Sequence, residues 1–321
     1  MGAHALGGEL DAVAGPARAE LVRRIGLGGV WDADPGWRAV FEAVPRHLFV
    51  PYYYVGVAGG HERLWGGSPD PRVRERWLRG VYADAPLATR LRDGELVSSS
   101  SQPSLMARML VELGVTDGSR VLEIGAGTGY NAALLAHRLG DGLVTTVDLE
   151  PEITESARTH LADAGYRPRV VTGDGARGVP EHAPYDRIIA TCALPSVPPA
   201  WLAQCSPGAR ILAPLATGLI ALTVRDAEHA EGSFLDTAAY FVPLRGTGPD
   251  PADEVPHRSG DHELFRFLLT LTHGTLDPQD AHELWEREGR PGRERYGVTV
   301  EGGRVRAWLD DPEGPYSWLL R

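Results

Sequence analysis

The sequence predicts an α/β fold in which helices cover both faces of a mainly parallel sheet. Between residues 103 and 224, short apolar segments alternate with segments whose apolar residues have helical spacing. That alternation is typical of parallel strands joined by crossover helices. Glycines stand where the helices are expected to end. A glycine-rich segment, residues 125–129, follows the first of these strands and opens the next helix.

Each predicted element follows from a local pattern. Helices are expected from Leu105 to a stop at Gly114, over residues 131–139 to a stop at Gly140, and from Pro151 to a stop at Gly165. Strands are predicted over residues 120–124, 143–147, 169–172, 186–190, 210–215 and 219–224. After residue 260, helices are expected over residues 262–270 and 279–287, followed by a hairpin of strands 298–300 and 304–309 around Gly302-Gly303.

The N-terminal region is less regular. Residues 1–20 are rich in Gly and Ala, show no clear apolar period, and are expected to be frayed or weakly helical. Residues 37–44 have the pattern of a short helix. Residues 45–51 are bounded by two prolines, which favours a fixed, extended connection. Residues 52–80 carry many aromatic residues and glycines and give no assignment.

These patterns suggest three segments along the chain. Residues 1–97 form an N-terminal extension and helical cap, residues 98–245 form the central ligand-binding domain, and residues 246–321 are a C-terminal addition of helices plus a hairpin. Residues 246–259 are dominated by Pro, Gly, Asp and Glu, which indicates a linker or exposed loop. We expect the addition to pack on the central domain, where it can serve as a peptide-recognition element.

Composition excludes several classes of protein. The chain has 321 residues, and its hydrophobic fraction of 43% is ordinary for a soluble globular protein. A net charge of −11 argues against a nucleic-acid partner, because phosphate binding needs a surplus of basic side chains. No apolar stretch reaches the length that crosses a membrane, and no signal-peptide pattern opens the chain, so a cytoplasmic location is expected. The two cysteines form neither a disulfide framework nor a metal site, and no metal is expected.

The glycine-rich segment, Gly125-Ala126-Gly127-Thr128-Gly129, is the central motif. Glycines allow a sharp turn and a close approach to a ligand, and the following helix offers free N–H groups. A dinucleotide site needs another glycine three residues after the second one, and Tyr130 stands there instead. The motif therefore favours a nucleoside with an amino-acid tail, whose ammonium group the nearby Glu123 can hold.

Acidic residues end the next two predicted strands. Asp148, followed by Leu149, can accept hydrogen bonds from both hydroxyls of a ribose, because parallel strands end at the same edge of a sheet. Asp174 can accept from an adenine amino group, while the neighbouring Gly175 lets the backbone pass the ring. For both aspartates a simple role in a turn is the alternative.

Several segments resemble the protein-L-isoaspartate O-methyltransferases. They are residues 44–51, 123–130, 173–175 and 183–189, and the resemblance extends over about residues 41–242. It implies a class I S-adenosylmethionine-dependent methyltransferase fold, Rossmann-like, with S-adenosylmethionine as cofactor and a carboxylate of a peptide or protein as acceptor. By motif position it implies cofactor contacts, and with the glycine motif the expected set is Glu123, Gly125, Ala126, Gly127, Thr128, Gly129, Asp148, Leu149, Asp174 and Gly175.

The family has a serine two residues ahead of a proline, and Ser101 matches that position. The surroundings depart from the family pattern, because Ser100, Gln102 and Ser104 replace its usual neighbours. We expect hydroxyls of the loop at Ser99, Ser100 and Ser101 to hold the acceptor carboxylate, with Thr191 on the same rim. Since a carboxylate of pKa about 4 is already ionised at neutral pH, no general base is needed. Alternatively, Ser101 and Gln102 simply cap the helix that starts at Pro103.

Residues 98–101, 296–300 and 308–312 look like a particular branch, the methyltransferases that accompany ATP-grasp ligases in making graspetides, which are crosslinked ribosomal peptides. That resemblance implies methylation of an Asp in an ATP-grasp-modified precursor peptide, followed by closure to an aspartimide. Repair of L-isoaspartate in damaged proteins is the alternative substrate. A non-catalytic peptide-binding subunit that keeps the fold is the alternative from another class. An amine methyltransferase is disfavoured, because Thr191-Cys192-Ala193-Leu194-Pro195 lacks the Asn/Asp-Pro-Pro-Tyr of those enzymes.

Overall fold

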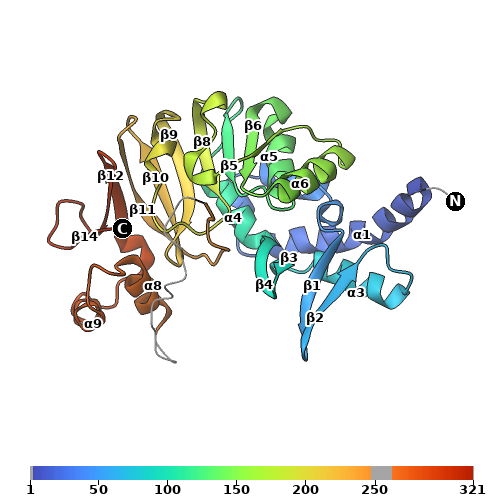
Figure 1. Ribbon diagram of the computed structural model, residues 1–321, viewed down its shortest axis with the longest axis horizontal. Helices are drawn as coiled ribbons and strands as arrows, with labels where there is room; N and C mark the ends of the chain where they lie inside the picture. Colours follow the sequence, from blue (N-terminus) through green and yellow to red (C-terminus); the bar gives the residue numbers. More distant parts are fainter. Residues whose placement is uncertain (1–2, 247–261, 321) are drawn as a thin grey trace. The chain divides into compact units, whose positions relative to one another are not determined.

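The computed structural model describes residues 3–246 and 262–320 (Figure 1). The predicted linker at 246–259 lies outside these residues from 247 onward. The chain forms two compact units, and it passes between them several times. The first consists of Met1–Gly118, Ala126–Thr146 and Glu150–Val170, and the second of Ser119–Gly125, Val147–Leu149 and Val171–Arg321.

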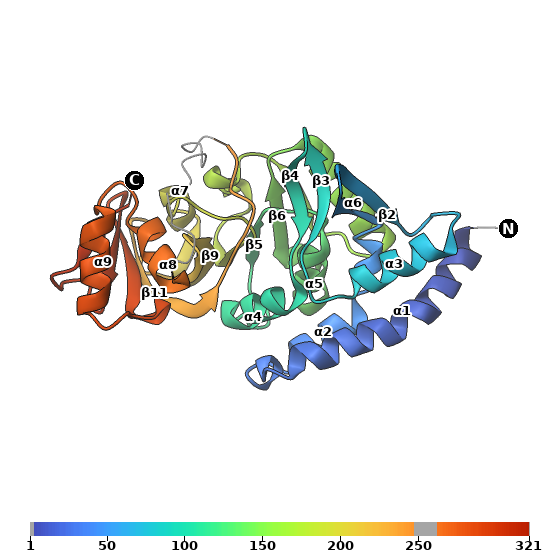
Figure 2. The same cartoon turned by 90° about the horizontal axis from the view of Figure 1, so that it is seen from below.

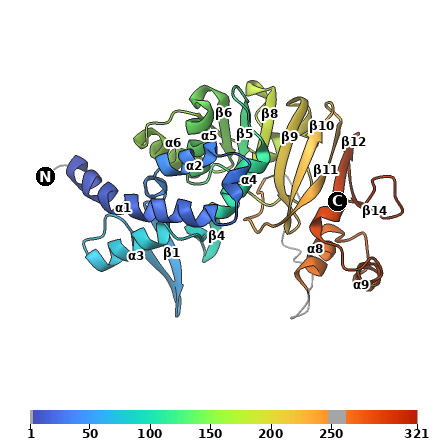
Figure 3. The same ribbon diagram turned by 180° about the vertical axis from the view of Figure 1, so that it is seen from behind.

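Six helices belong to the first unit. They are α1 (Ala3–Gly26), α2 (Gly36–Ala43), α3 (Pro71–Val81), α4 (Pro103–Leu113), α5 (Tyr130–Leu139) and α6 (Pro151–Asp163). Of the two alternatives expected for residues 1–20, frayed or weakly helical, the structure has a helix, α1, which lies beside α2 and α4 (Figures 2 and 3). Leu21 and Val22 of α1 are buried, and the Trp31 indole donates to the carbonyl of Val22. One buried stripe near the C-terminal end therefore anchors the helix.

The first unit also contains a four-stranded antiparallel sheet in the order β2-β1-β3-β4. Its strands are β1 (Tyr52–Val57), β2 (Gly60–Trp65), β3 (Leu87–Arg92) and β4 (Glu95–Ser100). Two expectations are corrected here. Ser99 and Ser100 lie in β4, an edge strand, and not in a loop. Residues 45–51 are not extended throughout, because Arg46–Leu48 form a 3₁₀ turn closed by the bond from Leu48 N to Pro45 O.

The long sheet has ten strands in the order β14-β13-β12-β11-β10-β9-β8-β5-β6-β7. Strand β8 (Tyr185–Ala190) pairs in parallel with β5 (Val121–Ile124) and β9 (Cys205–Leu215), whereas the strands from β9 to β14 pair antiparallel. The remaining strands are β6 (Val144–Asp148), β7 (Arg169–Thr172), β10 (Gly218–Val224), β11 (His229–Ala238), β12 (Tyr296–Glu301), β13 (Arg304–Leu309) and β14 (Ser317–Leu319). The predicted α/β architecture is present, but the antiparallel strands from β9 to β14 make the sheet mixed and not mainly parallel.

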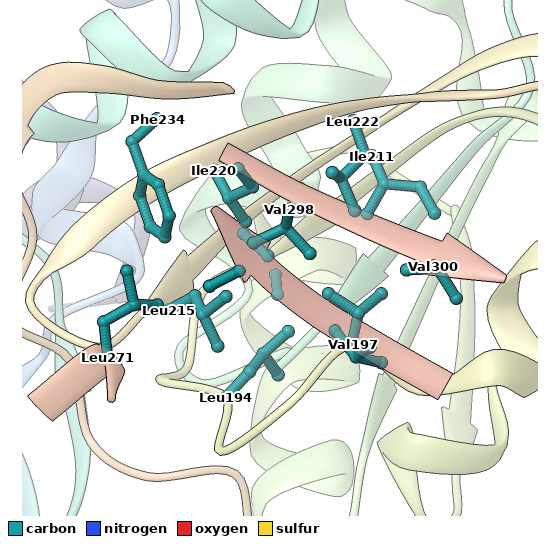
Figure 4. Packing of buried hydrophobic residues seen from close by; sticks show 14 of the residues in the cluster. Leu194, Val197, Ile211, Leu215, Ile220, Leu222, Phe234, Leu271, Val298 and Val300 are labelled. Carbon is teal, nitrogen blue, oxygen red and sulfur yellow. The ribbon is translucent and has the colours of Figure 1, made fainter. Parts of the chain in front are cut away.

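Residues after the linker continue the same sheet. Strand β12 pairs with β11, and helices α8 (Glu263–Leu271) and α9 (Pro278–Arg287) lie beside these strands (Figure 1). Phe267 of α8 is fully buried, 4.9 Å from the Phe234 ring of β11. Figure 4 shows the shared core, in which Ile220, Phe234, Leu271 and Val298 converge. The two C-terminal helices and the hairpin predicted from the sequence are confirmed.

Within the described residues, no helix combines the length and the apolar composition that crossing a membrane would need.

Candidate functional site

In the second unit, backbone hydrogen bonds tie together the carboxyl ends of four strands. The N–H of Gly125 donates to the carbonyl of Val147 at 2.8 Å, and that of Gly173 to Asp148 at 2.9 Å. The N–H of Thr191 donates to Ile124 at 2.9 Å. These bonds gather the ends of β5, β6, β7 and β8 at one edge, where an α/β sheet commonly binds its ligand.

The acidic candidates differ in burial. Glu123 is fully buried in β5, one residue before the strand ends. Asp148 is half-buried at the end of β6, and Leu149 after it exposes 36% of its surface. A half-buried carboxylate that accepts hydrogen bonds, next to an exposed apolar side chain, fits a ribose and an adenine ring. The geometry of this edge is therefore compatible with the predicted nucleoside.

Asp174 and Gly175 have structural duties as well. The Oδ1 of Asp174 accepts from the N–H of Ala176 at 2.9 Å and caps a short 3₁₀ turn, Gly175–Arg177. A Cβ added to Gly175 would lie 2.6 Å from the Ile124 side chain, so this position is glycine because of packing inside the protein. This packing constraint stands beside the expectation that Gly175 makes room for a ligand ring, which stays a prediction.

Thr191 holds the beginning of the glycine motif. Its hydroxyl donates to the carbonyl of Gly125 at 2.8 Å, and Gly125 has a positive φ of 98°. A hydroxyl has a single proton to donate, so the Thr191 proton is used within the protein. The structure therefore assigns Thr191 to the shape of the glycine turn, and not to donation toward an acceptor carboxylate.

The rest of the glycine motif belongs to the first unit and runs beside β4. Gly127 has a φ of +50°, and a Cβ placed on it would lie 3.5 Å from the Ser99 carbonyl oxygen. Gly129, at a φ of +85°, is the N-cap of α5. His160 of α6 lies with Nδ1 3.0 Å from the carbonyl oxygen of Thr128. The predicted cofactor loop and the serine segment are thus neighbours within one compact unit.

A buried arginine forms hydrogen bonds with the serine segment. The guanidinium of Arg46 donates to the carbonyls of Ser100 and Ser101 at 3.3 and 3.0 Å and to the Ser100 hydroxyl at 3.2 Å. It also donates to the carbonyls of Val81, Ala83 and Ala85. Burial lowers the pKa of Arg46 to about 10, so the group remains charged at neutral pH.

These contacts separate the three predicted serines. Ser100 is 4% exposed and its hydroxyl binds Arg46, so its prediction as a group that contacts substrate is corrected to a structural role. Ser99 and Ser101 are half-buried. Across the described ranges, no side-chain hydrogen bond of Ser101 is formed, and its carbonyl accepts from Arg46.

Asp84 caps the N-terminus of α4. The sequence analysis did not predict this cap. Its Oδ1 accepts from the N–H of Ser104 at 2.8 Å, and its Oδ2 accepts from the Gln102 side chain at 3.3 Å. Gln102 occupies the N-cap position without a capping bond from its own side chain. The alternative role for Ser101, capping this helix, is therefore filled by a residue that lies seventeen positions earlier in the chain.

A pocket in the first unit connects these parts. Its lining includes Phe49, Tyr52, Arg90, Ser98, Gly127 and His160. Arg90 forms an ion pair with Glu152 of α6. Of the important residues, Arg46, Asp84, Arg90 and His160 were not identified from the sequence. Each acts on a segment far away in the chain, and only Arg46 stood inside a recognisable motif, residues 44–51.

Metal ligands do not cluster in the part of the chain that the structure describes. No group of three or more His, Cys, Asp or Glu side chains is arranged to hold a metal ion there.

Comparison with known proteins identifies the family. The family model for protein-L-isoaspartate(D-aspartate) O-methyltransferase matches residues 72–247. A protein-L-isoaspartate O-methyltransferase of Aeropyrum pernix is 35% identical over 239 residues, which cover 72% of this chain and 80% of the relative. Protein-L-isoaspartate O-methyltransferase 1 of Anaeromyxobacter is 36% identical over 235 residues, covering 71% and 95%.

Solved structures agree with this assignment. A protein-L-isoaspartate O-methyltransferase superposes with a TM-score of 0.63 at 25% identity, covering 94% of this chain and 98% of its own. A Plasmodium falciparum structure described as a putative member shares the fold, with a TM-score of 0.53 at 14% identity, covering 70% of this chain and 97% of its own. The chain therefore belongs to the protein-L-isoaspartate(D-aspartate) O-methyltransferase family of S-adenosylmethionine-dependent enzymes.

Proposed function

We propose that this protein transfers a methyl group from S-adenosylmethionine to an aspartyl-type carboxylate in a peptide. The observation that carries the proposal is the position of the Ser99–Ser101 segment, which lies beside Gly127 and in front of the buried Arg46. The names of the relatives add support, because they are protein-L-isoaspartate O-methyltransferases. A serine segment beside the glycine motif gives the acceptor carboxylate a position close to the cofactor.

The cofactor-binding roles follow the residues gathered at the sheet edge. The cofactor, when bound, supplies an electrophilic methyl group. In this proposal, Asp148 accepts hydrogen bonds from the ribose hydroxyls, Leu149 covers the adenine, and Glu123 holds the charged end of the amino-acid tail. Asp174 keeps its proposed role toward the adenine amino group, alongside its capping bond to Ala176.

The acceptor carboxylate requires hydrogen-bond donors that hold it. In a trans peptide the C=O and the following N–H point in opposite directions. Because Arg46 binds the carbonyls of Ser100 and Ser101, the N–H groups of Ser101 and Gln102 point away from it. Neither N–H donates to an acceptor within residues 3–246 or 262–320. With the Ser101 hydroxyl, they form a donor set for an oxygen anion.

No proton transfer is required of these residues. The carboxylate is already ionised, and the displacement is in line, so the protein contributes position and exclusion of water. Arg46 acts through the loop that it holds, and we regard it as a positioning residue. We likewise propose a functional division into a helical cap (1–97), a cofactor-binding domain (98–245) and a recognition element (246–321).

We infer further that the acceptor is an L-Asp in a structured, crosslinked ribosomal peptide. An ATP-grasp-modified precursor peptide is the best probe of this inference. The methyl ester is then attacked by the next backbone nitrogen, which releases methanol and closes a succinimide. The altered serine segment supports this proposal, since Ser100, Gln102 and Ser104 change the surroundings of Ser101. Residues 246–321 do not distinguish peptide tailoring from repair, because one solved protein-L-isoaspartate O-methyltransferase aligns with 94% of this chain.

Repair of L-isoaspartate is the second candidate, and the names of the relatives favour it. Mass spectrometry distinguishes the two. The protein is incubated with S-adenosylmethionine and, separately, an L-isoaspartyl peptide, its linear L-Asp form, and a crosslinked L-Asp peptide. Tailoring predicts a net loss of one water from the crosslinked peptide. Turnover confined to the isoaspartyl peptide overturns tailoring in favour of repair, and absence of any turnover with all three contradicts both activities.

A further inference from the structure

The small sheet of the first unit presents one open face made of aromatic and basic side chains. Facing residues of antiparallel strands point to the same side, and β1 and β2 pair as Tyr52 with Trp65, Tyr54 with Arg63, and Gly56 with His61. We call the side chains of Tyr52, Tyr54, His61, Arg63 and Trp65 the aromatic-arginine face. His61, Arg63 and Trp65 are exposed, and the two tyrosines are half-buried.

The opposite face of the same hairpin is covered by α3. Tyr53 and Leu64 are 3% exposed, and the Tyr53 hydroxyl donates to the carbonyl of Arg76 on that helix. Glu62 pairs with Arg76 through two hydrogen bonds of 2.8 Å. Figures 1 and 2 show α3 alongside the β1–β2 hairpin. On that side the hairpin is therefore packed against α3, and the Arg76 charge is paired with Glu62.

On the aromatic-arginine face, the Arg63 guanidinium lies over aromatic rings. The Arg63 guanidinium lies 4.3 Å from the centre of the Tyr52 ring and 5.8 Å from that of Trp65. Considering only residues that the structure describes, Arg63 forms no ion pair with a carboxylate, whereas Arg76 on the covered side does. Stacking on rings fixes a guanidinium without neutralising its charge. The face has no carboxylate of its own, although the chain carries a net charge of −11.

This face leads directly to the proposed acceptor segment. Strand register places one row across the sheet, in which Arg63 faces Tyr54, Tyr54 faces Ala88, and Ala88 faces Ser99. Tyr52 also lines the pocket that contains Ser98 and Gly127. Three strand spacings of about 4.8 Å separate β2 from β4, so Arg63 lies about 14 Å from the serine strand.

We propose that the aromatic-arginine face binds the peptide substrate and selects acidic residues that flank the methylated position. This inference rests on the proposed function. Charge complementarity favours a peptide with Asp or Glu, and the rings offer apolar contact to its backbone and side chains. An extended chain covers about 14 Å in about four residues, so the preferred acidic residue lies about four positions from the acceptor.

The test measures binding separately from methyl transfer. A fluorescein-labelled twelve-residue peptide with one Asp and two Glu residues four positions away on either side is titrated with the full chain and S-adenosylhomocysteine. A second peptide has Gln in place of both Glu residues. Arg63→Glu is compared with Arg72→Glu, because Arg72 is an exposed arginine on α3, which covers the opposite side of the sheet.

We expect Arg63→Glu to weaken binding of the acidic peptide about five- to tenfold, with a smaller effect at high salt and little effect on the Gln peptide. Arg72→Glu should match the unaltered protein. Equal affinity of Arg63→Glu and Arg72→Glu for the acidic peptide overturns the inference, as does absence of binding. A change in oligomeric state of Arg63→Glu with unchanged peptide affinity would make this face a self-association surface and also overturns it. Because the readout is binding, a failure of methyl transfer alone bears only on the proposed function.

Discussion

At the residue scale, adjacent serines with the same chemistry have different environments. The hydroxyl of Ser100 is bound by Arg46 and nearly inaccessible, while Ser101 is half-buried and only its carbonyl is bound by Arg46. A run of four serines cannot reveal this difference, because alternation along β4 and the position of Arg46 decide it. The sequence could therefore suggest the serine segment as a candidate acceptor site but could not identify which serine is inaccessible.

Ser101→Ala should reduce methyl transfer without weakening cofactor binding. Loss of one hydrogen bond to a charged acceptor corresponds to about 1.5–3 kcal/mol, so kcat/KM is expected to fall about tenfold or more. The affinity for S-adenosylhomocysteine, measured by calorimetry, should stay within about twofold. A marked fall in the melting temperature with intact turnover would instead identify Ser101 as a structural residue.

Arg46→Met should disorganise the acceptor segment, because the carbonyls of Ser100 and Ser101 lose their common donor. Unpaired buried carbonyls cost about 1–3 kcal/mol each, so a large loss of stability is expected as well. Ser100→Ala is the milder companion, since it removes the two hydrogen bonds from Arg46 to the Ser100 hydroxyl and leaves the guanidinium in place. It should raise the KM for peptide more than it changes cofactor affinity. Wild-type kinetic constants in a folded Arg46→Met protein would refute the positioning role.

Asp148→Ala tests the proposed contact to the ribose. Removing a charge-assisted hydrogen bond should weaken S-adenosylhomocysteine binding about ten- to a hundredfold, with little change in stability because Asp148 is only half-buried. Calorimetry measures this directly. Asp163→Ala, at the end of α6, is a suitable control. Unchanged affinity in a folded Asp148→Ala protein would remove the assignment.

At the element scale, the sequence predicts most elements between residues 103 and 224 and misses several strands outside that range. The helices that end at Gly114 and Gly140 were predicted because apolar spacing and a terminal glycine agree. Strands β1 and β2 were missed because each is only six residues long and has a single fully buried residue, so neither shows a clear period of two. Strand β11 was missed for a similar reason, since polar residues occupy much of its ten-residue length.

The candidate site could be predicted only in part from the sequence. Residues at the ends of β5 and β6 were found because parallel strands bring their carboxyl ends together, whatever the details of packing. Asp84 and His160 could not be found, since they reach α4 and the glycine motif through tertiary contacts that leave no periodic signal.

Asp84→Ala should weaken α4 at its N-terminus. The carboxylate accepts from Ser104 N–H at 2.8 Å and is also favoured by the helix dipole, a combination that stabilises by about 1 kcal/mol. Urea denaturation should show a loss of that size, and Asp84→Asn, which keeps an acceptor oxygen, should lose less. Equal stability of Asp84→Ala and the unaltered protein would show that the cap contributes nothing.

At the scale of the whole molecule, the two compact units do not coincide with the three functional segments that we propose. The glycine motif is shared between the units, since Gly125 belongs to the second and Ala126 to the first. The C-terminal addition is a separate segment in the sequence, yet β12 pairs with β11 and α8 contributes to the core of the second unit. Sequence periodicity shows where elements lie, but it cannot show that two distant segments fill one core.

The C-terminal addition should therefore be indispensable for folding of the second unit. Phe267 of α8 is fully buried, with ring centres 4.9 Å from Phe234 and 5.4 Å from Tyr296. Phe267→Ala should cost about 3–5 kcal/mol, whereas Leu319→Ala, at a side chain 49% exposed, should cost far less. Because a domain has about 5–15 kcal/mol of stability in total, a chain that ends at residue 245 should lose cooperative unfolding altogether. Circular dichroism during chemical denaturation measures both effects. A truncated chain that unfolds cooperatively at the same midpoint as the full chain would show that the addition is a dispensable appendage, and would leave peptide recognition as its remaining role.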